Sequence, residues 1–239
     1  MPRLPSVPAH RESFQVTDEV RCLWPASAVL GEGGLWSVAR QCLFWVDILS
    51  CHIHRLDPAT GAQQSWTFDE EVSALAERRT GEGLAIALRR GPAFWNPDQP
   101  GVPPRYLCQP EPERSGNRFN DARCDAAGRW WMGSMDFGCA LPTGSLYRVG
   151  ADGAWARMDE GFAVTNGPTW IAQGRTMLFN DTVNGQVLAY DSHPDTGEIG
   201  GFYQTAGASY CLQAGVQEFG YALFIMDDEA FRSLNRTGG

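Results

Sequence analysis

The chain has 239 residues, enough to bury a large hydrophobic core in one large domain or two small ones. Hydrophobic residues make up 43% of it and charged residues 20%, as in an ordinary globular protein. It carries 28 acidic and 19 basic residues, a formal net charge of −9, and no basic stripe that could neutralise a phosphate backbone. This balance argues against nucleic acid as a partner. It suits cation binding, although acidic balances are also common in soluble proteins.

The seven cysteines are odd in number and show no C-x-x-C spacing, so neither a disulfide framework nor a zinc ribbon is indicated. No 18 apolar residues run together, and the first residues lack the apolar core of a signal peptide. We therefore expect a cytoplasmic protein with no membrane partner.

Short strands joined by turns are predicted from the first third of the chain onward. The segment "GGLWSVARQCLFWVDILSCHIHRLDPATG" contains three strand-sized pieces: Leu35 with Trp36, then "CLFWVDI", then "HIHRLD". The closing "DPATG" is an Asp-Pro turn in which Gly61 is free to take a positive φ.

The same order of elements returns three times downstream, in "VSALAERRTGEGLAIALRRGPAFWNPD", in "FNDARCDAAGRWWMGSM" with "TGSLYRVGADG", and in "NGPTWIAQGRTMLFND" with "GQVLAYDSHPDTGEIG". The first residues of the repeats, Glu32, Ser73, Asn120 and Asn166, follow one another at intervals of 41, 47 and 46 residues. Four short strands at this period are typical of propeller blades. A β-sandwich is the alternative, whereas an α/β fold lacks the amphipathic helices it needs.

In a propeller the innermost strand of each blade lines the central channel, so these four residues are predicted to converge there. A carboxylate and two amides offer the hard oxygen ligands that suit Ca²⁺, Mg²⁺ or Mn²⁺. Each residue also has a simpler interpretation, because Glu32 in "GEGG", Asn120 in "FND" and Asn166 in "TNGP" are ordinary turn residues.

The motifs "LGEGGLW", "NRFNDARCDAAGRWWMGSMD", "TGSLYRV" and "NGPTW…GRTMLFNDT" resemble the SMP-30/gluconolactonase family, which includes regucalcin and the bacterial sugar lactonases. The resemblance runs from about residue 20 to about residue 205. It implies an all-β, six-bladed β-propeller, here with about four recognisable blades and an atypical C-terminal segment. We expect a single, incomplete propeller domain over 1–239, with an N-terminal extension and closing strand in 1–19 and a divergent tail in 207–239.

The resemblance also implies roles for individual residues. Glu32 and Asn166 match metal ligands of the family, Arg118 and Asn120 match residues that hold the sugar, and Asp136 matches a variable acidic substrate-binding position at the channel mouth. The implied cofactor is one divalent cation: Ca, Zn, Mn, Mg or Fe. The implied partner is a small sugar lactone, which the enzyme hydrolyses to the aldonic acid.

One aspartate of the sequence has no assigned role, and one motif of the family is missing. Asp181 in "FNDT" lies where the family usually has Asp on a strand near the site. The family's fifth blade begins with "PDG", whose Asp is a metal ligand and the general base, and the tail after Ala206 has no such motif. The catalytic residue is therefore unknown, and the alternative is a non-catalytic propeller that binds a cation or a protein.

A serine hydrolase mechanism is disfavoured because the chain has no G-x-S-x-G motif. The histidines at 10, 52, 54 and 193 do not occupy the repeat positions that are predicted to line the channel. His52 and His54 alternate on an outer strand, where exposed or core histidines are the usual outcome, although metal binding by the pair is the other possibility.

Overall fold

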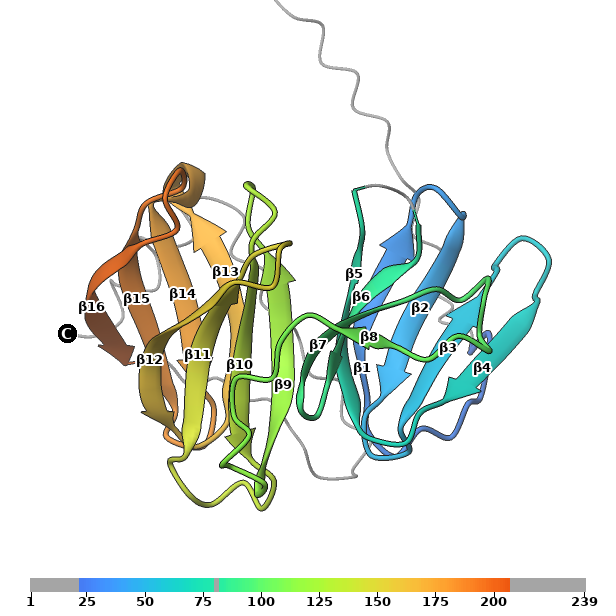
Figure 1. Cartoon of the computed structure of the whole chain (residues 1–239), viewed down its shortest axis with the longest axis horizontal. Helices are drawn as coiled ribbons and strands as arrows, with labels where there is room; N and C mark the ends of the chain where they lie inside the picture. The colour runs from blue at the N-terminus through green and yellow to red at the C-terminus, as the bar shows by residue number, and fades with distance from the viewer. Residues whose placement is uncertain (1–21, 80–81, 207–239) are drawn as a thin grey trace, which may run out of the picture.

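The computed structural model describes residues 22–79 and 82–206, which form four separate sheets of four antiparallel strands each (Figure 1). Each sheet contains four strands that are consecutive in the chain. We call the sheets blades 1 to 4. This is the all-β architecture predicted from the repeat, and four separate sheets rule out the β-sandwich.

The strands begin where the repeat predicts them. Blade 1 contains β1 (Gly31–Ser37), β2 (Cys42–Asp47), β3 (His52–Leu56) and β4 (Gln63–Thr67). Blade 2 contains β5 (Val72–Glu77), β6 (Leu84–Leu88), β7 (Gly91–Trp95) and β8 (Arg105–Tyr106). Blade 3 contains β9 (Asn117–Cys124), β10 (Trp130–Asp136), β11 (Gly144–Val149) and β12 (Trp155–Phe162). Blade 4 contains β13 (Thr165–Ile171), β14 (Thr176–Asp181), β15 (Gln186–Ser192) and β16 (Ile199–Ala206), with the short 3-10 helix η1 (Ala172–Gly174) between β13 and β14.

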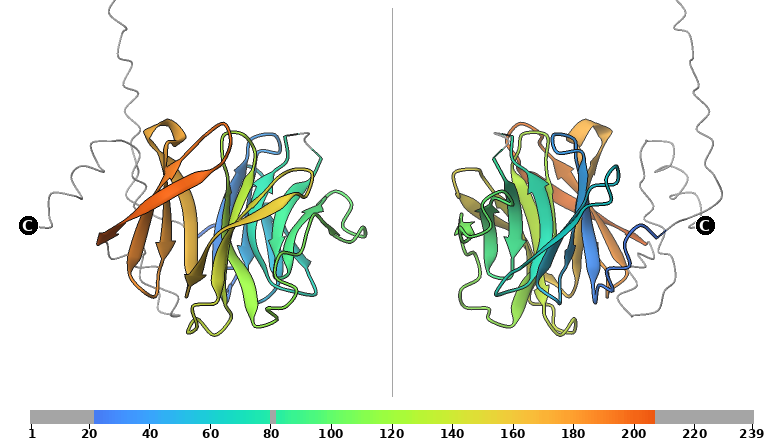
Figure 2. Two further views of the ribbon diagram at one scale, coloured as in Figure 1. Left: turned by 60° about the vertical axis from the view of Figure 1, so that its left-hand side comes forward. Right: turned by 90° about the vertical axis from the view of Figure 1, so that its right-hand side faces the viewer.

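The first strand of each blade contacts the first strand of the next, in the series β1, β5, β9 and β13. The blades therefore follow one another around a common centre, as Figures 1 and 2 show for blades coloured from blue to orange. This arrangement brings residues that are far apart in the sequence together along the innermost strands. No helix among the described residues is long and apolar enough to cross a membrane.

The hydrophobic core lies between neighbouring blades. One cluster, with Phe44 and Ile86, joins blades 1 and 2. A second, with Phe119 and Trp130, joins blades 2 and 3, and a third, with Phe179, joins blades 3 and 4. Strand β6 is buried along its whole length, because alternate side chains face the two neighbouring blades. A single blade could not bury both faces, which is why the repeat is needed for the fold.

Several predictions fall on residues outside the described ranges. The N-terminal extension and closing strand expected in 1–19 and the divergent tail 207–239 both lie wholly outside the described residues. The fifth-blade aspartate sought in that tail is therefore not tested by the structure.

Candidate functional site

A β-bulge interrupts the first strand of every blade, at the same position in blades 1 and 4. In β1, Glu32 pairs with Val46 and the bulge follows before Leu35; in β13, Asn166 pairs with Asn180 and the bulge follows before Thr169. Each bulge sets two residues opposite one, which bends the strand and redirects its side chains. By register, therefore, Glu32 and Asn166 occupy equivalent positions, as the repeat predicted.

Glycine opens the bulge in both of these blades. Gly33 follows Glu32 with φ of 63°, and Gly167 follows Asn166 with φ of 95°. Only glycine takes such left-handed conformations at no steric cost. The "GEGG" and "NGP" motifs that could be interpreted as plain turns are thus bulge sequences on innermost strands.

In blade 3 the bulge begins one residue earlier than the position of Asn120 in the predicted repeat would place it. In β9 the last paired residue before the bulge is Phe119, opposite Ser134, and Asn120 itself lies in the bulge. Asn120 is therefore not at the register position of Asn166, although the two are 46 residues apart. Their side chains nevertheless meet, since Nδ2 of Asn120 lies 3.3 Å from Oδ1 of Asn166.

The side chains of Arg118, Asn120 and Asn166 form one hydrogen-bonded group. Nη1 of Arg118 donates to Oδ1 of Asn120 at 2.7 Å, and Nδ2 of Asn120 donates to the carbonyl oxygen of Thr165 at 2.7 Å. Nδ2 of Asn166 donates to Oγ1 of Thr182 at 2.7 Å. That bond orients the Asn166 amide so that its oxygen is directed toward Asn120.

Arg118 brings a positive charge into the buried part of this group. Its side chain is buried, and burial lowers the pKa of Arg118 from its ordinary value, while the charges of Cys139, Glu32 and Glu71 act in the opposite direction. A guanidinium remains charged even so. Glu32 is partly buried, and its carboxylate lies near enough to influence Arg118. Hydrogen bonds thus join the predicted site residues of blades 3 and 4, and the strand register places Glu32 at the equivalent position of blade 1.

Asp121 has a structural role that the sequence left open. It is the second bulge residue of β9, and its Oδ2 accepts a hydrogen bond from the Gly167 backbone N–H at 2.9 Å. Its Oδ1 accepts from Nη1 of Arg123 at 2.8 Å and from the Ala122 backbone N–H at 2.8 Å. Asp121 therefore ties the bulge of blade 3 to the bulge of blade 4, directly beside Asn166.

Asp136 and Asp181 both bind backbone amides. Oδ2 of Asp136 accepts from the N–H groups of Ala140 and Leu141 at 3.0 and 3.1 Å, and these bonds hold the pKa of Asp136 below its ordinary value. Asp136 is the last residue of β10 and pairs with Asn117 of β9. The neighbouring pair is Met135 with Arg118, so Asp136 lies next to the hydrogen-bonded group. Its place at the edge of the group is compatible with the substrate-binding role predicted for it, which stays a prediction.

Asp181 accepts from the N–H groups of Ala163 and Val164, just before β13 begins. Asp47 does the same in blade 1, where its two carboxylate oxygens accept from the N–H groups of Val29 and Leu30 at 3.0 and 2.9 Å. Both aspartates end the second strand of their blade, so they hold the chain where it enters the first strand. This explains the Asp181 position, and the same position in "FWVD" could have identified Asp47.

Ser73, the blade 2 member of the predicted series, contributes no metal ligand here. It is buried, and its hydroxyl lies 3.4 Å from the carbonyl oxygen of Ala87 in its own blade. The hard oxygen donors at the bulges are the Glu32 and Asp121 carboxylates and the Asn120 and Asn166 amides, of which Glu32 and Asn166 are the predicted metal ligands. Carboxylate and amide oxygens are the donors that Ca²⁺, Mg²⁺ and Mn²⁺ prefer, so this set fits a divalent cation.

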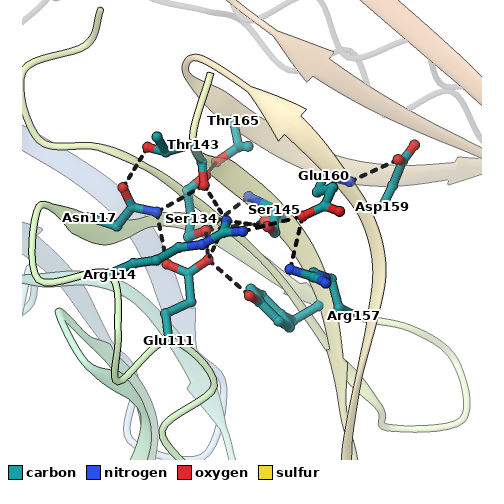
Figure 3. A network of polar contacts seen from close by, with 11 residues as sticks. Glu111, Arg114, Asn117, Ser134, Thr143, Ser145, Arg157, Asp159, Glu160 and Thr165 are labelled. Carbon is teal, nitrogen blue, oxygen red and sulfur yellow. Dashed lines mark hydrogen bonds and ion pairs between the residues drawn. The ribbon is translucent and has the colours of Figure 1, made fainter. Parts of the chain in front are cut away.

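A buried polar network centred on Glu111 supports the blade 3 side of the group (Figure 3). Its Oε1 accepts from Ser134 Oγ at 2.7 Å and from the Tyr147 hydroxyl at 2.9 Å, and its Oε2 accepts from Asn117 Nδ2 at 2.9 Å. Burial and the neighbouring Glu111 carboxylate raise the pKa of Tyr147 to about 12. Because Asn117 precedes Arg118, the network fixes the start of β9. Sequence reasoning missed it, since "CQPEPERSGN" has no strand pattern.

Comparison with known proteins decides the family. The family model described as SMP-30/Gluconolactonase/LRE-like region matches residues 30–208 of the chain. The chain belongs to this family. The match covers the four blades and the resemblance seen in the sequence is confirmed.

Relatives in the family carry names that refer to lactonases. YvrE of Bacillus subtilis, named as a sugar lactone lactonase, is 31% identical over 172 residues, which are 72% of this chain and 58% of YvrE. The 6-deoxy-6-sulfogluconolactonase of Pseudomonas putida is 31% identical over 188 residues, which are 77% of this chain and 64% of that enzyme. The chain thus spans about three fifths of the length of these family members.

A solved structure in the family has the same fold. The calcium-binding protein regucalcin of Agrobacterium tumefaciens superimposes with a TM-score of 0.68 at 26% identity, covering 74% of this chain and 59% of that protein.

Proposed function

We propose that this protein hydrolyses a sugar lactone to the corresponding aldonic acid with the help of a divalent cation. The observation that carries the proposal is the contact of 3.3 Å between Asn120 Nδ2 and Asn166 Oδ1, which joins the predicted sugar-binding pair to the predicted metal ligands. Family membership and the lactonase names of the relatives support the same activity.

The proposed reaction is the hydrolysis of an ester that closes a sugar ring. Water adds to the carbonyl carbon, the ring C–O bond breaks, and one proton is released as the carboxylic acid ionises. A bound divalent cation supplies an electrophile for the carbonyl oxygen and lowers the pKa of a coordinated water. Glu32 and Asn166 would hold this cation, with Ca, Zn, Mn, Mg or Fe as the possible identities.

The other proposed roles fall to residues of blade 3. Arg118 and Asn120 would position the hydroxyls and ring oxygen of the sugar, and Asp136 would contact the substrate at the mouth. Burial strengthens the charged Arg118 donor, because fewer water molecules compete for it. No described residue is assigned as the general base. A xylono- or gluconolactone is the proposed substrate class.

Proton release tests the activity. Glucono- and xylonolactone would be added to the purified chain with Mn²⁺, Zn²⁺ or Ca²⁺, and hydrolysis above the spontaneous rate is expected with at least one ion. Glu32→Gln should lower that rate roughly 100-fold, because it removes the only carboxylate of the proposed ligand set. Glu113→Gln, at an exposed glutamate outside the group, is the matched control and should retain the parent rate.

A non-catalytic propeller that binds a cation is the second candidate. It is favoured by the small charge of the proposed ligand pair, which is one carboxylate, Glu32, and one amide, Asn166. In that case Ca²⁺ or Mn²⁺ would bind in a calorimetric titration, Glu32→Gln would abolish the binding, and no lactone would be hydrolysed faster than in buffer.

The six described cysteines are free, which supports a reducing, cytoplasmic setting in either case.

A further inference from the structure

Three potential metal ligands meet on blade 1 outside the group described above. One ligand atom from each of Asp47, His52 and His54 lies within 4.8 Å of the other two, and no other trio of His, Cys, Asp or Glu in the described ranges is so close. Asp47 ends β2 directly opposite His52 in β3, and His54 follows His52 by two residues on the same face. Strand alternation thus accounts for the cluster.

The burial of His54 distinguishes this cluster from an ordinary group of surface residues. His54 is only 7% exposed, and its Nε2 is buried and has no hydrogen-bond partner within residues 22–79 and 82–206. Its Nδ1 lies 2.8 Å from the hydroxyl of Ser65. A buried polar atom without a partner costs about 1–3 kcal/mol, so such atoms usually have a function or a missing partner. A metal ion would be that partner.

The contacts of His54 match those of a metal-binding histidine. Such a residue usually donates its second ring N–H to a neighbouring oxygen, which fixes the tautomer and the ring orientation. Ser65 is placed to accept from Nδ1 at 2.8 Å, leaving the Nε2 lone pair for a ligand. Trp45 and Trp24 pack against the ring, with centroids 5.1 and 5.2 Å from that of His54, and exclude water from it.

The aspartate is also prepared for this role. Both Asp47 oxygens accept backbone N–H bonds, from Val29 at 3.0 Å and Leu30 at 2.9 Å, and Ser50 also donates to this carboxylate, so a metal ion would take the place of the Ser50 donor. His52 is partly exposed, so its ring has room to turn. The ligand atoms of a tetrahedral zinc site lie about 3.3 Å apart. Rotation of the His52 ring would bring its nitrogen closer to the other two ligand atoms, which now lie within 4.8 Å of it.

We propose that Asp47, His52 and His54 form a second metal site, on the face of blade 1 turned away from blade 2, which takes Zn²⁺ or another borderline divalent ion. Two imidazoles and one carboxylate suit Zn²⁺ better than Ca²⁺, which prefers oxygen ligands alone. Three protein ligands leave the fourth position to water. The ion would bridge β2 and β3, and none of its ligands belongs to the group assigned to the lactone.

Calorimetric titration with zinc sulfate tests the site in the full-length Glu32→Gln variant, where the proposed channel ligand is removed. We expect one zinc ion to bind per chain. His52→Ala should weaken binding at least about 100-fold, and Ser65→Ala, which removes only the partner of Nδ1, about 10- to 100-fold. Ser65 is exposed, so its substitution leaves the core intact. His193→Ala removes an exposed histidine elsewhere and should bind zinc unchanged.

Imidazole ¹⁵N spectra give a second measurement that does not depend on affinity. Zinc should shift the resonances of His52 and His54 and leave that of His193 in place. Absence of zinc binding, or binding that His52→Ala leaves unweakened, overturns the proposal. Because every variant carries Glu32→Gln, these outcomes are independent of whether the chain hydrolyses a lactone.

Discussion

Aspartates at the ends and bulges of the strands bind backbone N–H groups in this protein. Asp47 and Asp181 hold the chain as it enters the first strand of blades 1 and 4, and Asp136 holds the turn that follows β10. Charge-assisted bonds of this kind are stronger than neutral ones. Asp121 differs from these three, because its backbone partner Gly167 belongs to another blade.

Replacing Asp121 should therefore affect both stability and the site. Asp121→Ala removes the bond to the Gly167 N–H at 2.9 Å, and the free energy of unfolding should fall by about 1–3 kcal/mol. Urea denaturation measures the change. Since Gly167 follows Asn166, the affinity for Mn²⁺ or Ca²⁺ should fall as well, which a calorimetric titration measures.

Two variants control for this prediction. Asp121→Asn retains one acceptor oxygen and should lose less stability than the alanine variant. Asp69→Ala removes an exposed aspartate and should leave both quantities unchanged. An Asp121→Ala protein as stable as Asp69→Ala would show that the bond between blades 3 and 4 contributes nothing.

At this scale the sequence predicted which residue types would meet, but not how they would bond. Asn120 and Asn166 were expected to be near each other, and they are. Whether Asn120 and Asp121 were turn residues or ligands could not be decided, because the answer depends on the neighbouring blade. The Glu111 network was missed for the same reason, since its partners lie on β9, β10 and β11.

Among the elements, the bulged first strands position the site. Composition and turn spacing predicted the four described blades and their starts, because each blade repeats the same alternation and the same turns. The one-residue offset in β9 could not be predicted, since a bulge changes the register without changing the hydrophobic pattern on either side. Strand β10, which pairs with the bulged β9, also contacts β13 of the next blade.

Gly133 allows that contact. It lies in β10, opposite the bulge of β9, and a Cβ there would come within 2.4 Å of Thr165 Oγ1 and 3.0 Å of Phe179. Gly133→Ala should push blade 4 away and lower the free energy of unfolding by about 1–3 kcal/mol, as measured by urea denaturation. Thr165 also accepts the Asn120 bond, so cation affinity should fall in parallel.

Gly201→Ala is the matched control, because a Cβ at that position in β16 meets nothing within 4 Å. It should be as stable as the parent. Equal stability of the Gly133 and Gly201 variants would mean that blades 3 and 4 can separate without cost.

On the scale of the whole molecule, the described residues form a core of three clusters between neighbouring blades. None of these clusters contains residues of both blade 1 and blade 4. Stability in such a series is approximately a sum of blade and interface contributions, and a local change mainly affects its own neighbours. The repeat predicted this serial arrangement from sequence, since each blade carries apolar residues on both faces.

Reciprocal substitutions in the first and third clusters test this serial arrangement. Phe44 and Phe179 are both fully buried, the first between blades 1 and 2 and the second between blades 3 and 4. Phe44→Ala and Phe179→Ala should each lower the free energy of unfolding by about 3–5 kcal/mol. Backbone hydrogen exchange followed by mass spectrometry should separate them: Phe44→Ala should speed exchange mainly in β1 to β8, and Phe179→Ala mainly in β9 to β16. If both variants sped exchange equally in all four blades, the molecule would unfold as one unit and the serial description would be wrong.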